Sequence, residues 1–275
     1  MPGPNLDLRM ALKQGQELLE QAGIHAPRLT AEVLLAHAIG CDRVYLYAHS
    51  TDPLKEVWWI HYGRYLHERM GGKPTQYITG RQEFYGREFR VTPDVLIPRP
   101  ETEHLIEAAL PRAQGRVLDI GTGSGAIAAT LALETGTRVF ATDISSAALD
   151  VAARNAQTLK APVWFAACDL GSAFLSESFD LVVSNPPYVP EGDTIQREVR
   201  EHEPRVALYA GADGLAIYRR LIPEAARLLK AGGWLAMELG YRSSEAVRAM
   251  LEDWDGVETV NDLAGFPRVI VAKKR

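Results

Sequence analysis

An Asn-Pro-Pro-Tyr segment, Asn185-Pro186-Pro187-Tyr188, carries residue types that could hold a planar amino group. Two successive prolines fix the backbone angle φ and remove two N–H donors, so backbone carbonyl oxygens are left free to accept hydrogen bonds. Asn185 adds a side-chain carbonyl acceptor and an amide donor. Tyr188 adds an aromatic face that suits a planar group or a nearby sulfonium cation. The segment could therefore bind an amide or an adenine amino group.

Holding such a group serves one kind of chemistry. A planar amino group is a poor nucleophile because its nitrogen lone pair is delocalised. The Asn185 side chain and the Pro186 carbonyl could accept its two N–H groups and aim the nitrogen at an electrophilic carbon. This predicts Asn185, Pro186 and Tyr188 as catalytic residues, with Pro187 completing the substrate-binding segment and no metal involved. The alternative is that the segment is only a proline-rich exit from a strand.

A second chemical signal is the glycine-rich run Gly121-Thr122-Gly123-Ser124-Gly125, which lies between an apolar strand pattern and an alanine-rich helical pattern. Glycines allow a tight turn and let a ligand approach backbone N–H groups at a helix N-terminus. The spacing is G-x-G-x-G, not the dinucleotide spacing G-x-G-x-x-G, because position 126 is alanine. It suits a smaller group, such as an amino-acid carboxylate. We therefore expect this loop to bind a cofactor.

Two aspartates follow the next two predicted strands. Asp143 comes 18 residues after Gly125, and its carboxylate could accept two hydrogen bonds from a ribose 2′,3′-diol. Asp169 ends the following strand and could accept from an adenine amino group. The loop and both aspartates together fit S-adenosylmethionine better than a dinucleotide. The alternative is a structural turn between a strand and a helix, with two aspartates on the surface.

The elements that must position these residues begin at about residue 93, where short apolar strands alternate with helices. This pattern predicts an α/β fold with a mostly parallel sheet and helices on both faces. Two final strands joined without a helix, 257–260 and 269–272, would add an antiparallel edge. Ligands bind beyond the carboxyl ends of parallel strands, where the residues above would meet. The other expected strands are 116–120, 138–142, 163–167, 179–184 and 234–238.

The residues before position 93 have a different pattern. Apolar residues recur at helical spacing up to residue 22, again from 29 to 39, and again from 57 to 70, with glycine or proline between the runs. Residues 76–92 have the composition of a hairpin, with Tyr77-Ile78 expected on one side of Thr79-Gly80. The sequence thus predicts a helical bundle at 1–75, a β-hairpin linker at 76–92 and an α/β domain at 93–275.

Composition restricts the classes of function. The 275 residues carry a net charge of −5, and residues 1–92 hold 11 Lys and Arg against 10 Asp and Glu. Neither half is strongly basic, which argues against bulk electrostatic binding to nucleic acid. Two cysteines suggest a reducing compartment. Residues 1–10 contain no apolar signal core, and no stretch approaches 18 apolar residues. We expect a cytoplasmic protein with no membrane partner.

These residues carry a resemblance to known enzymes. The run 119–125, Asp143 and the Asn-Pro-Pro-Tyr segment resemble class I methyltransferases that act on planar nitrogens. Residues 96–103 (LIPRPETE) and the segments VREHEP and GADGL within 199–215 narrow the resemblance to the protein-(glutamine-N5) methyltransferases of the PrmC/HemK type. The resemblance covers essentially the whole chain, including the helical region and the hairpin.

The resemblance implies a class I methyltransferase fold, Rossmann-like, with a small helical-bundle domain before it. It implies S-adenosyl-L-methionine as cofactor, S-adenosyl-L-homocysteine as product, and methylation of the glutamine N5 in the GGQ motif of class-1 peptide chain release factors. Gly121 to Gly125 and Asp143 would bind the cofactor, and Asp169 and Leu170 would border its adenine. The segment from Asn185 to Tyr188 would hold the glutamine, with Asn185 also next to the cofactor. The N-terminal helices would contact the release factor.

Other functions remain open on the residues alone. The same chemistry could act on a glutamine of a ribosomal protein. Asn-Pro-Pro-Tyr loops also serve adenine-N6 methylation of nucleic acid, although the chain shows no basic face and no target-recognition domain. A non-enzymatic reading is a scaffold that binds the cofactor without transferring its methyl group.

Overall fold

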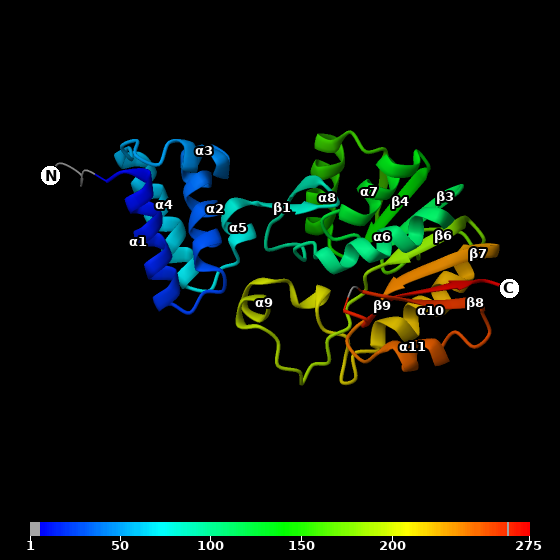
Figure 1. Ribbon diagram of the computed structural model, residues 1–275. Helices are drawn as coiled ribbons and strands as arrows, with labels where there is room; N and C mark the ends of the chain where they lie inside the picture. Colours follow the sequence, from blue (N-terminus) through cyan, green and yellow to red (C-terminus); the bar gives the residue numbers. More distant parts are fainter. Residues whose placement is uncertain (1–5, 263) are drawn as a thin grey trace. The chain divides into compact units, whose positions relative to one another are not determined.

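The computed structural model describes residues 6–262 and 264–275, which fall into two compact units (Figure 1). The first unit runs up to Gly80 and also contains the distant segment Gln196–His202. The second unit consists of Arg81–Ile195 and Glu203–Arg275. Residues 1–5, part of the segment in which we expected no signal core, lie outside the described residues. No helix in the described ranges is long and apolar enough to cross a membrane.

The first unit is a bundle of helices, as the periodicity predicts. Asp7 accepts a hydrogen bond from the backbone N–H of Met10 and so caps the first helix, while Gly40, in the left-handed conformation, ends the second. Arg69 of the fourth helix forms an ion pair with Glu198 at 2.6 Å, inside the same unit. The helices are α1 (Leu8–Gln21), α2 (Pro27–Ile39), α3 (Arg43–Ala48), α4 (Glu56–Met70), α5 (Thr75–Thr79) and α9 (Arg197–His202).

The predicted linker differs from the structure at its first residues. Thr75–Thr79 forms helix α5, so the expectation that Tyr77-Ile78 begins a hairpin is wrong. Both side chains are buried, and Ile78 belongs to the core of the first unit. The hairpin itself is shorter and later: β1 (Arg81–Phe84) pairs antiparallel with β2 (Arg87–Arg90). Its two-residue turn at 85–86 has positive φ at both positions, the geometry of a tight hairpin.

The second unit contains a seven-stranded sheet in the order β5-β4-β3-β6-β7-β9-β8. The first five strands in this order are parallel, and β9 pairs antiparallel with both of its neighbours. The chain builds outward from β3 to β5 and then returns to place β6 on the other side of β3. The strands are β3 (Arg116–Ile120), β4 (Arg138–Asp143), β5 (Val163–Ala167), β6 (Phe179–Ser184), β7 (Leu229–Glu238), β8 (Asp255–Asn261) and β9 (Pro267–Lys273).

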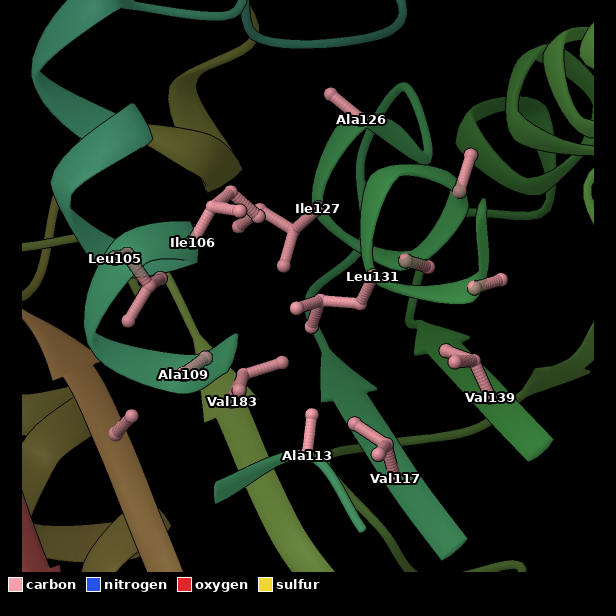
Figure 2. Packing of buried hydrophobic residues seen from close by; sticks show 14 of the residues in the cluster. Leu105, Ile106, Ala109, Ala113, Val117, Ala126, Ile127, Leu131, Val139 and Val183 are labelled. Atoms are coloured by element: carbon pink, nitrogen blue, oxygen red, sulfur yellow. The ribbon is translucent and has the colours of Figure 1, made fainter. Parts of the chain in front are cut away.

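Helices cover both faces of this sheet because the central strands are apolar on both sides. Val117 and Val183 pack on one face against side chains of α6 and α7, as Figure 2 shows, whereas Leu118 and Val182 face the other cluster with α10 and α11. The helical elements of this unit are η1 (Pro100–Thr102), α6 (Glu103–Ala109), η2 (Leu110–Arg112), α7 (Ala126–Thr135), α8 (Ser146–Leu159), η3 (Arg205–Ala207), α10 (Ala216–Leu228) and α11 (Ser244–Ala249).

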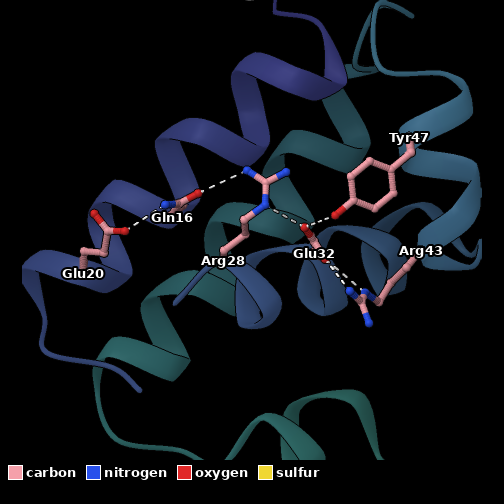
Figure 3. A network of polar contacts seen from close by, with 6 residues as sticks. All are labelled: Gln16, Glu20, Arg28, Glu32, Arg43 and Tyr47. Atoms are coloured by element: carbon pink, nitrogen blue, oxygen red, sulfur yellow. Dashed lines mark hydrogen bonds and ion pairs between the residues drawn. The ribbon is translucent and has the colours of Figure 1, made fainter. Parts of the chain in front are cut away.

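A buried carboxylate organises the polar contacts of the first unit (Figure 3). Glu32 of α2 is only 2% exposed. It accepts hydrogen bonds from Arg28 Nε at 3.0 Å, from Arg43 Nη2 at 2.7 Å and from the hydroxyl of Tyr47. Burial alone would raise the pKa of Glu32, but the bonds from Tyr47 and Arg43 and the two positive charges hold it below its ordinary value. The ionised form therefore stabilises the contact of α2 with α3.

We expect Glu32→Gln to lower the free energy of unfolding of the full chain by about 2 kcal/mol, because charge-assisted hydrogen bonds are lost with little change in shape. Urea titration followed by circular dichroism measures it. Because the folded-state pKa is lowered, the deficit should be present at neutral pH and shrink as the pH falls and Glu32 protonates in the wild type. Glu17→Gln, at an exposed pair with Lys13, is the matched control and should be neutral. Equal stability of both variants would contradict this account.

Candidate functional site

A cavity of about 220 Å³ lies in the second unit, at the carboxyl ends of strands β3 to β6. It collects segments that are far apart in the chain: the glycine loop, the ends of β4 and β5, the Asn-Pro-Pro-Tyr segment and residues around Arg99. Of the residues that the sequence singled out, its wall contains Gly121, Thr122, Gly123, Ser124, Asp143, Asp169, Leu170, Asn185, Pro186 and Pro187. Gly125 and Tyr188 are not part of the wall.

The glycine loop has the tightly turned, left-handed backbone that its glycines allow. Gly121, Gly123 and Gly125 all have positive φ, at 74°, 54° and 80°. A Cβ atom on Gly121 or Gly123 would meet no atom within 4 Å, so both α-carbons border open space that a ligand can enter. A Cβ on Gly125 would lie 3.0 Å from Cβ of Ala152, because this glycine packs the start of α7 against α8. Gly121 and Gly123 therefore leave room for a ligand, whereas Gly125 allows two helices to pack closely.

Asp143 ties the end of β4 to this loop. Its Oδ2 accepts from the backbone N–H of Gly123 and its Oδ1 from that of Ser145, both at 2.9 Å. Each carboxylate oxygen can accept a further hydrogen bond. Asp143 can thus hold the loop in place and still receive a diol from the cavity.

Asp119, which the sequence reading quoted only as part of the motif, is completely buried beneath the loop. Its Oδ2 accepts from Thr122 Oγ1 at 2.6 Å, while its Oδ1 is buried without a hydrogen-bond partner among the described residues. Burial raises the pKa of Asp119 to about 7, against the lowering effect of the Thr122 hydroxyl. Its contact with Thr122 fixes the second residue of the loop.

The end of β5 brings together Asp169, Leu170 and an arginine that sequence reasoning missed. Arg220 of α10 lines the cavity and forms an ion pair with Asp169, and both side chains are half exposed. Leu170 has φ of 50°, the left-handed conformation that is uncommon for leucine, and its carbonyl accepts from Cys168 Sγ at 3.3 Å. Arg220 belongs to an amphipathic helix with several arginines, so nothing in its spacing separates it from them.

Asn185 follows β6, whose last residue, Ser184, donates its hydroxyl to the carbonyl of Ile120 in β3 at 2.7 Å. The Asn185 Nδ2 donates to Thr102 Oγ1 at 3.1 Å. Its donor side is therefore used by the protein, and Oδ1 is the atom that the side chain can offer to an N–H group in the cavity. This agrees with the chemistry that the segment predicts.

Tyr188 lies behind this wall rather than on it. Its hydroxyl donates to Glu238 Oε1 at 3.3 Å, and its ring packs on Gly240, where a Cβ atom would come within 2.9 Å of the ring. Burial raises the pKa of the Tyr188 hydroxyl far above its ordinary value, so the side chain stays neutral. The aromatic face next to a sulfonium remains a prediction, while the packing on Gly240 is observed.

A second missed pair joins the two segments that carried the family resemblance. Glu203, 5% exposed, accepts from the backbone N–H of Ile97 at 3.2 Å and from the guanidinium of Arg99. Arg99 lines the cavity. The pairing of residues more than a hundred positions apart leaves no periodic signal in a single sequence.

The comparisons with known proteins agree with this geometry. Residues 10–80 match the family model described as the PrmC N-terminal domain, and residues 100–202 match the methyltransferase small domain. A release factor glutamine methyltransferase from Koribacter versatilis is 47% identical over 98% of this chain and 99% of its own length. One from Geobacter sulfurreducens is 41% identical over 96% and 95%.

The chain belongs to the release factor glutamine methyltransferase family. A solved methyltransferase structure from Pyrococcus furiosus, at 20% identity, superposes with a TM-score of 0.53 over 70% of this chain and 90% of the other, and it supports the fold alone. The predicted class I methyltransferase fold, with its antiparallel edge and preceding helical region, is confirmed. The family resemblance inferred from the motifs is confirmed as well.

For this family member, we expect Gly240→Ala to cost about 1–3 kcal/mol of unfolding free energy, since the added methyl overlaps the Tyr188 ring. The same substitution at Gly63 in α4 is the control, because a Cβ there meets nothing within 4 Å. It should be neutral or stabilising by up to about 1 kcal/mol, as alanine favours a helix. Thermal unfolding of both proteins measures the difference, and a neutral Gly240 variant would show that the ring has room to move.

Proposed function

We propose that this protein transfers a methyl group from S-adenosyl-L-methionine to the side-chain amide nitrogen (N5) of the glutamine in the GGQ motif of class-1 peptide chain release factors, in the cytoplasm. The observation that carries the proposal is the position of Asn185. Its amide donor is engaged by Thr102, and the side chain borders the same cavity as the glycine loop. The names of the relatives in Koribacter and Geobacter support the choice of acceptor.

The cavity suits the proposed cofactor. Open space beside the α-carbons of Gly121 and Gly123 admits a group against the backbone, and Asp143 retains acceptor capacity for a ribose diol. Asp169 and Leu170 form the wall where an adenine would lie. When bound, S-adenosylmethionine supplies a methyl group already activated by the sulfonium charge.

The residues of the chain then act by orientation. The Asn185 Oδ1 and the Pro186 carbonyl accept the two N–H groups of the glutamine amide and direct its nitrogen into the cavity. Both acceptors also stabilise the positive charge that develops on this nitrogen as the new bond forms. The proline at 187 has no N–H group that could compete for the same carbonyl oxygens. Because an alkylated amide nitrogen loses its proton readily, the site needs no strong base.

We expect Asn185→Ala to abolish methyl transfer while cofactor affinity stays within about threefold of wild type, because the lost acceptor binds mainly the glutamine. Mass spectrometry of a release factor, after incubation with enzyme and cofactor, measures a gain of one methyl on the GGQ glutamine. Calorimetry measures cofactor affinity. Asn261→Ala, at an exposed position at the end of the edge strand β8, should behave as wild type. Methylation of DNA, RNA or a ribosomal protein in place of the release factor would contradict the proposed acceptor.

We expect Asp143→Asn to weaken cofactor binding by about tenfold to a hundredfold, since one charge-assisted acceptor becomes an amide donor. The change also loosens the loop, because Asp143 receives the N–H groups of Gly123 and Ser145. Calorimetric titration with S-adenosylhomocysteine gives the affinity without turnover. Asp150→Asn, on an exposed position of α8, removes the same charge and should leave the affinity unchanged. If Asp143→Asn bound S-adenosylhomocysteine as tightly as wild type, the ribose would not contact Asp143.

A further inference from the structure

Four side chains, Asn185, Thr102, Glu238 and Tyr188, form a hydrogen-bonded chain at the cavity, in which Thr102 also lines the wall and Glu238 has been given no role so far. Thr102 of η1 donates its hydroxyl to Glu238 Oε2 at 2.6 Å and accepts from Asn185 Nδ2 at 3.1 Å. Glu238 is the last residue of β7 and is 2% exposed. Its other oxygen accepts from the Tyr188 hydroxyl at 3.3 Å. The Glu238 carboxylate thus binds the Tyr188 hydroxyl directly and is linked to Asn185 through the Thr102 hydroxyl.

The direction of these bonds is fixed by a single proton. The Thr102 hydroxyl has one hydrogen, and giving it to Glu238 leaves only acceptor capacity toward Asn185. The amide must then turn Nδ2 toward Thr102 and Oδ1 away from it. Oδ1 is the atom required to accept an N–H group of the substrate amide. An ionised Glu238 is therefore what selects the productive orientation of Asn185.

A protonated Glu238 would reverse this chain. With the proton on Oε2, the carboxyl group would donate to Thr102, and the Thr102 hydrogen would point at Asn185, where only Oδ1 can accept it. The amide would rotate and present Nδ2 to the cavity. Two N–H donors, one on the enzyme and one on the substrate, would then face each other, which is repulsive. The two protonation states thus differ at the reacting nitrogen.

Several charged or titratable groups face Glu238. Burial raises its pKa to about 7, the hydroxyls of Thr102 and Tyr188 and the charge of Arg268 lower it, and Glu101 raises it. Arg268 on β9 is itself paired with Asp262. Tyr218 of α10 donates to the backbone carbonyl of Glu238 at 2.8 Å and remains neutral, because burial raises its pKa as well. The balance leaves Glu238 able to change its charge near neutral pH.

We propose that Glu238, acting through Thr102, is a positioning residue that sets which atom of the Asn185 amide meets the acceptor nitrogen. This inference rests on the proposed function, and it adds a residue that determines the orientation of Asn185 in the same site. The positioning requires only that Thr102 keep a hydroxyl and that Glu238 keep a carboxylate. Neither side chain needs to touch the substrate.

Kinetics with a release factor provide the first test. We expect Thr102→Val, which removes the hydroxyl at equal size, to lower kcat by about tenfold or more. The KM for the release factor should change little, because the substitution alters the orientation of the Asn185 amide and removes no contact that the proposal assigns to the release factor. Thr102→Ser should restore kcat because it restores the hydroxyl. A purely structural role would lower stability in Thr102→Val and leave kcat of the folded enzyme unchanged, and that result would overturn the proposal.

The pH dependence provides the second test. Wild-type kcat should rise with pH through a limb near pH 7 as Glu238 ionises, and Glu238→Gln should abolish this limb. Asp119, whose pKa burial also raises to about 7, is unchanged in the variant. A limb that persists in Glu238→Gln would belong to Asp119 or another group and would overturn the assignment.

A third measurement does not depend on the acceptor. In the wild-type protein bound to S-adenosylhomocysteine, the side-chain amide signals of Asn185, assigned through Asn185→Asp, should shift with a midpoint near pH 7 in ¹⁵N NMR spectra. In Glu238→Gln they should not shift. If wild type fails to methylate the release factor while this titration is observed, the proposed function fails and the positioning stands. If methylation proceeds and Asn185 does not titrate, the positioning fails alone.

Discussion

The pairing of β3 with β6 is the constraint on which the site depends. The chain runs outward through β4 and β5 and returns, so β3 and β6 become parallel neighbours although 64 positions separate Ile120 from Ser184. At that switch the glycine loop leaves one strand and the Asn-Pro-Pro-Tyr segment leaves the next. The hydrogen bond from the Ser184 hydroxyl to the carbonyl of Ile120 joins the ends of these two strands. The glycine loop and the Asn-Pro-Pro-Tyr segment therefore face one cavity because of strand order, before any side chain is considered.

Two buried glutamates in the chain show how partners decide the state of a charge. Glu32 is surrounded by Arg28 and Arg43, and these partners lower its pKa despite burial. Among the described residues, the Glu238 carboxylate accepts hydrogen bonds from the hydroxyl groups of Thr102 and Tyr188, and burial raises its pKa to about 7. An arginine-paired carboxylate stays ionised and stabilises a helix contact, whereas one held by hydroxyls can respond to pH. The difference in pKa matches the places of the two residues: Glu32 lies in the helical bundle, and Glu238 lies next to the candidate site.

The sequence predicted features that depend on local chemistry. Strand and helix alternation, the glycine loop and the Asn-Pro-Pro-Tyr segment arise from residues adjacent in the chain, and the structure contains each of them. The short helix at Thr75–Thr79 was missed because its apolar Tyr77 and Ile78 also fit a strand, and only burial in the helical core decides between the two. The contacts of Thr102, Glu203, Arg220 and Glu238 were missed for another reason. Their partners lie 50 to 136 positions away, and no spacing rule connects them.

The same distinction explains why the glycines of this chain cannot be interpreted from the motif alone. Gly121 and Gly123 border open space, where a side chain would reduce the room for a ligand. Gly125 and Gly240 border protein, Ala152 in one case and the Tyr188 ring in the other. A glycine at a motif position can therefore serve packing, and a glycine outside any motif can serve the site. Gly240 does so by letting Tyr188 lie close to β7, which brings its hydroxyl to Glu238 and connects the end of the Asn-Pro-Pro-Tyr segment to the carboxylate that also binds Thr102.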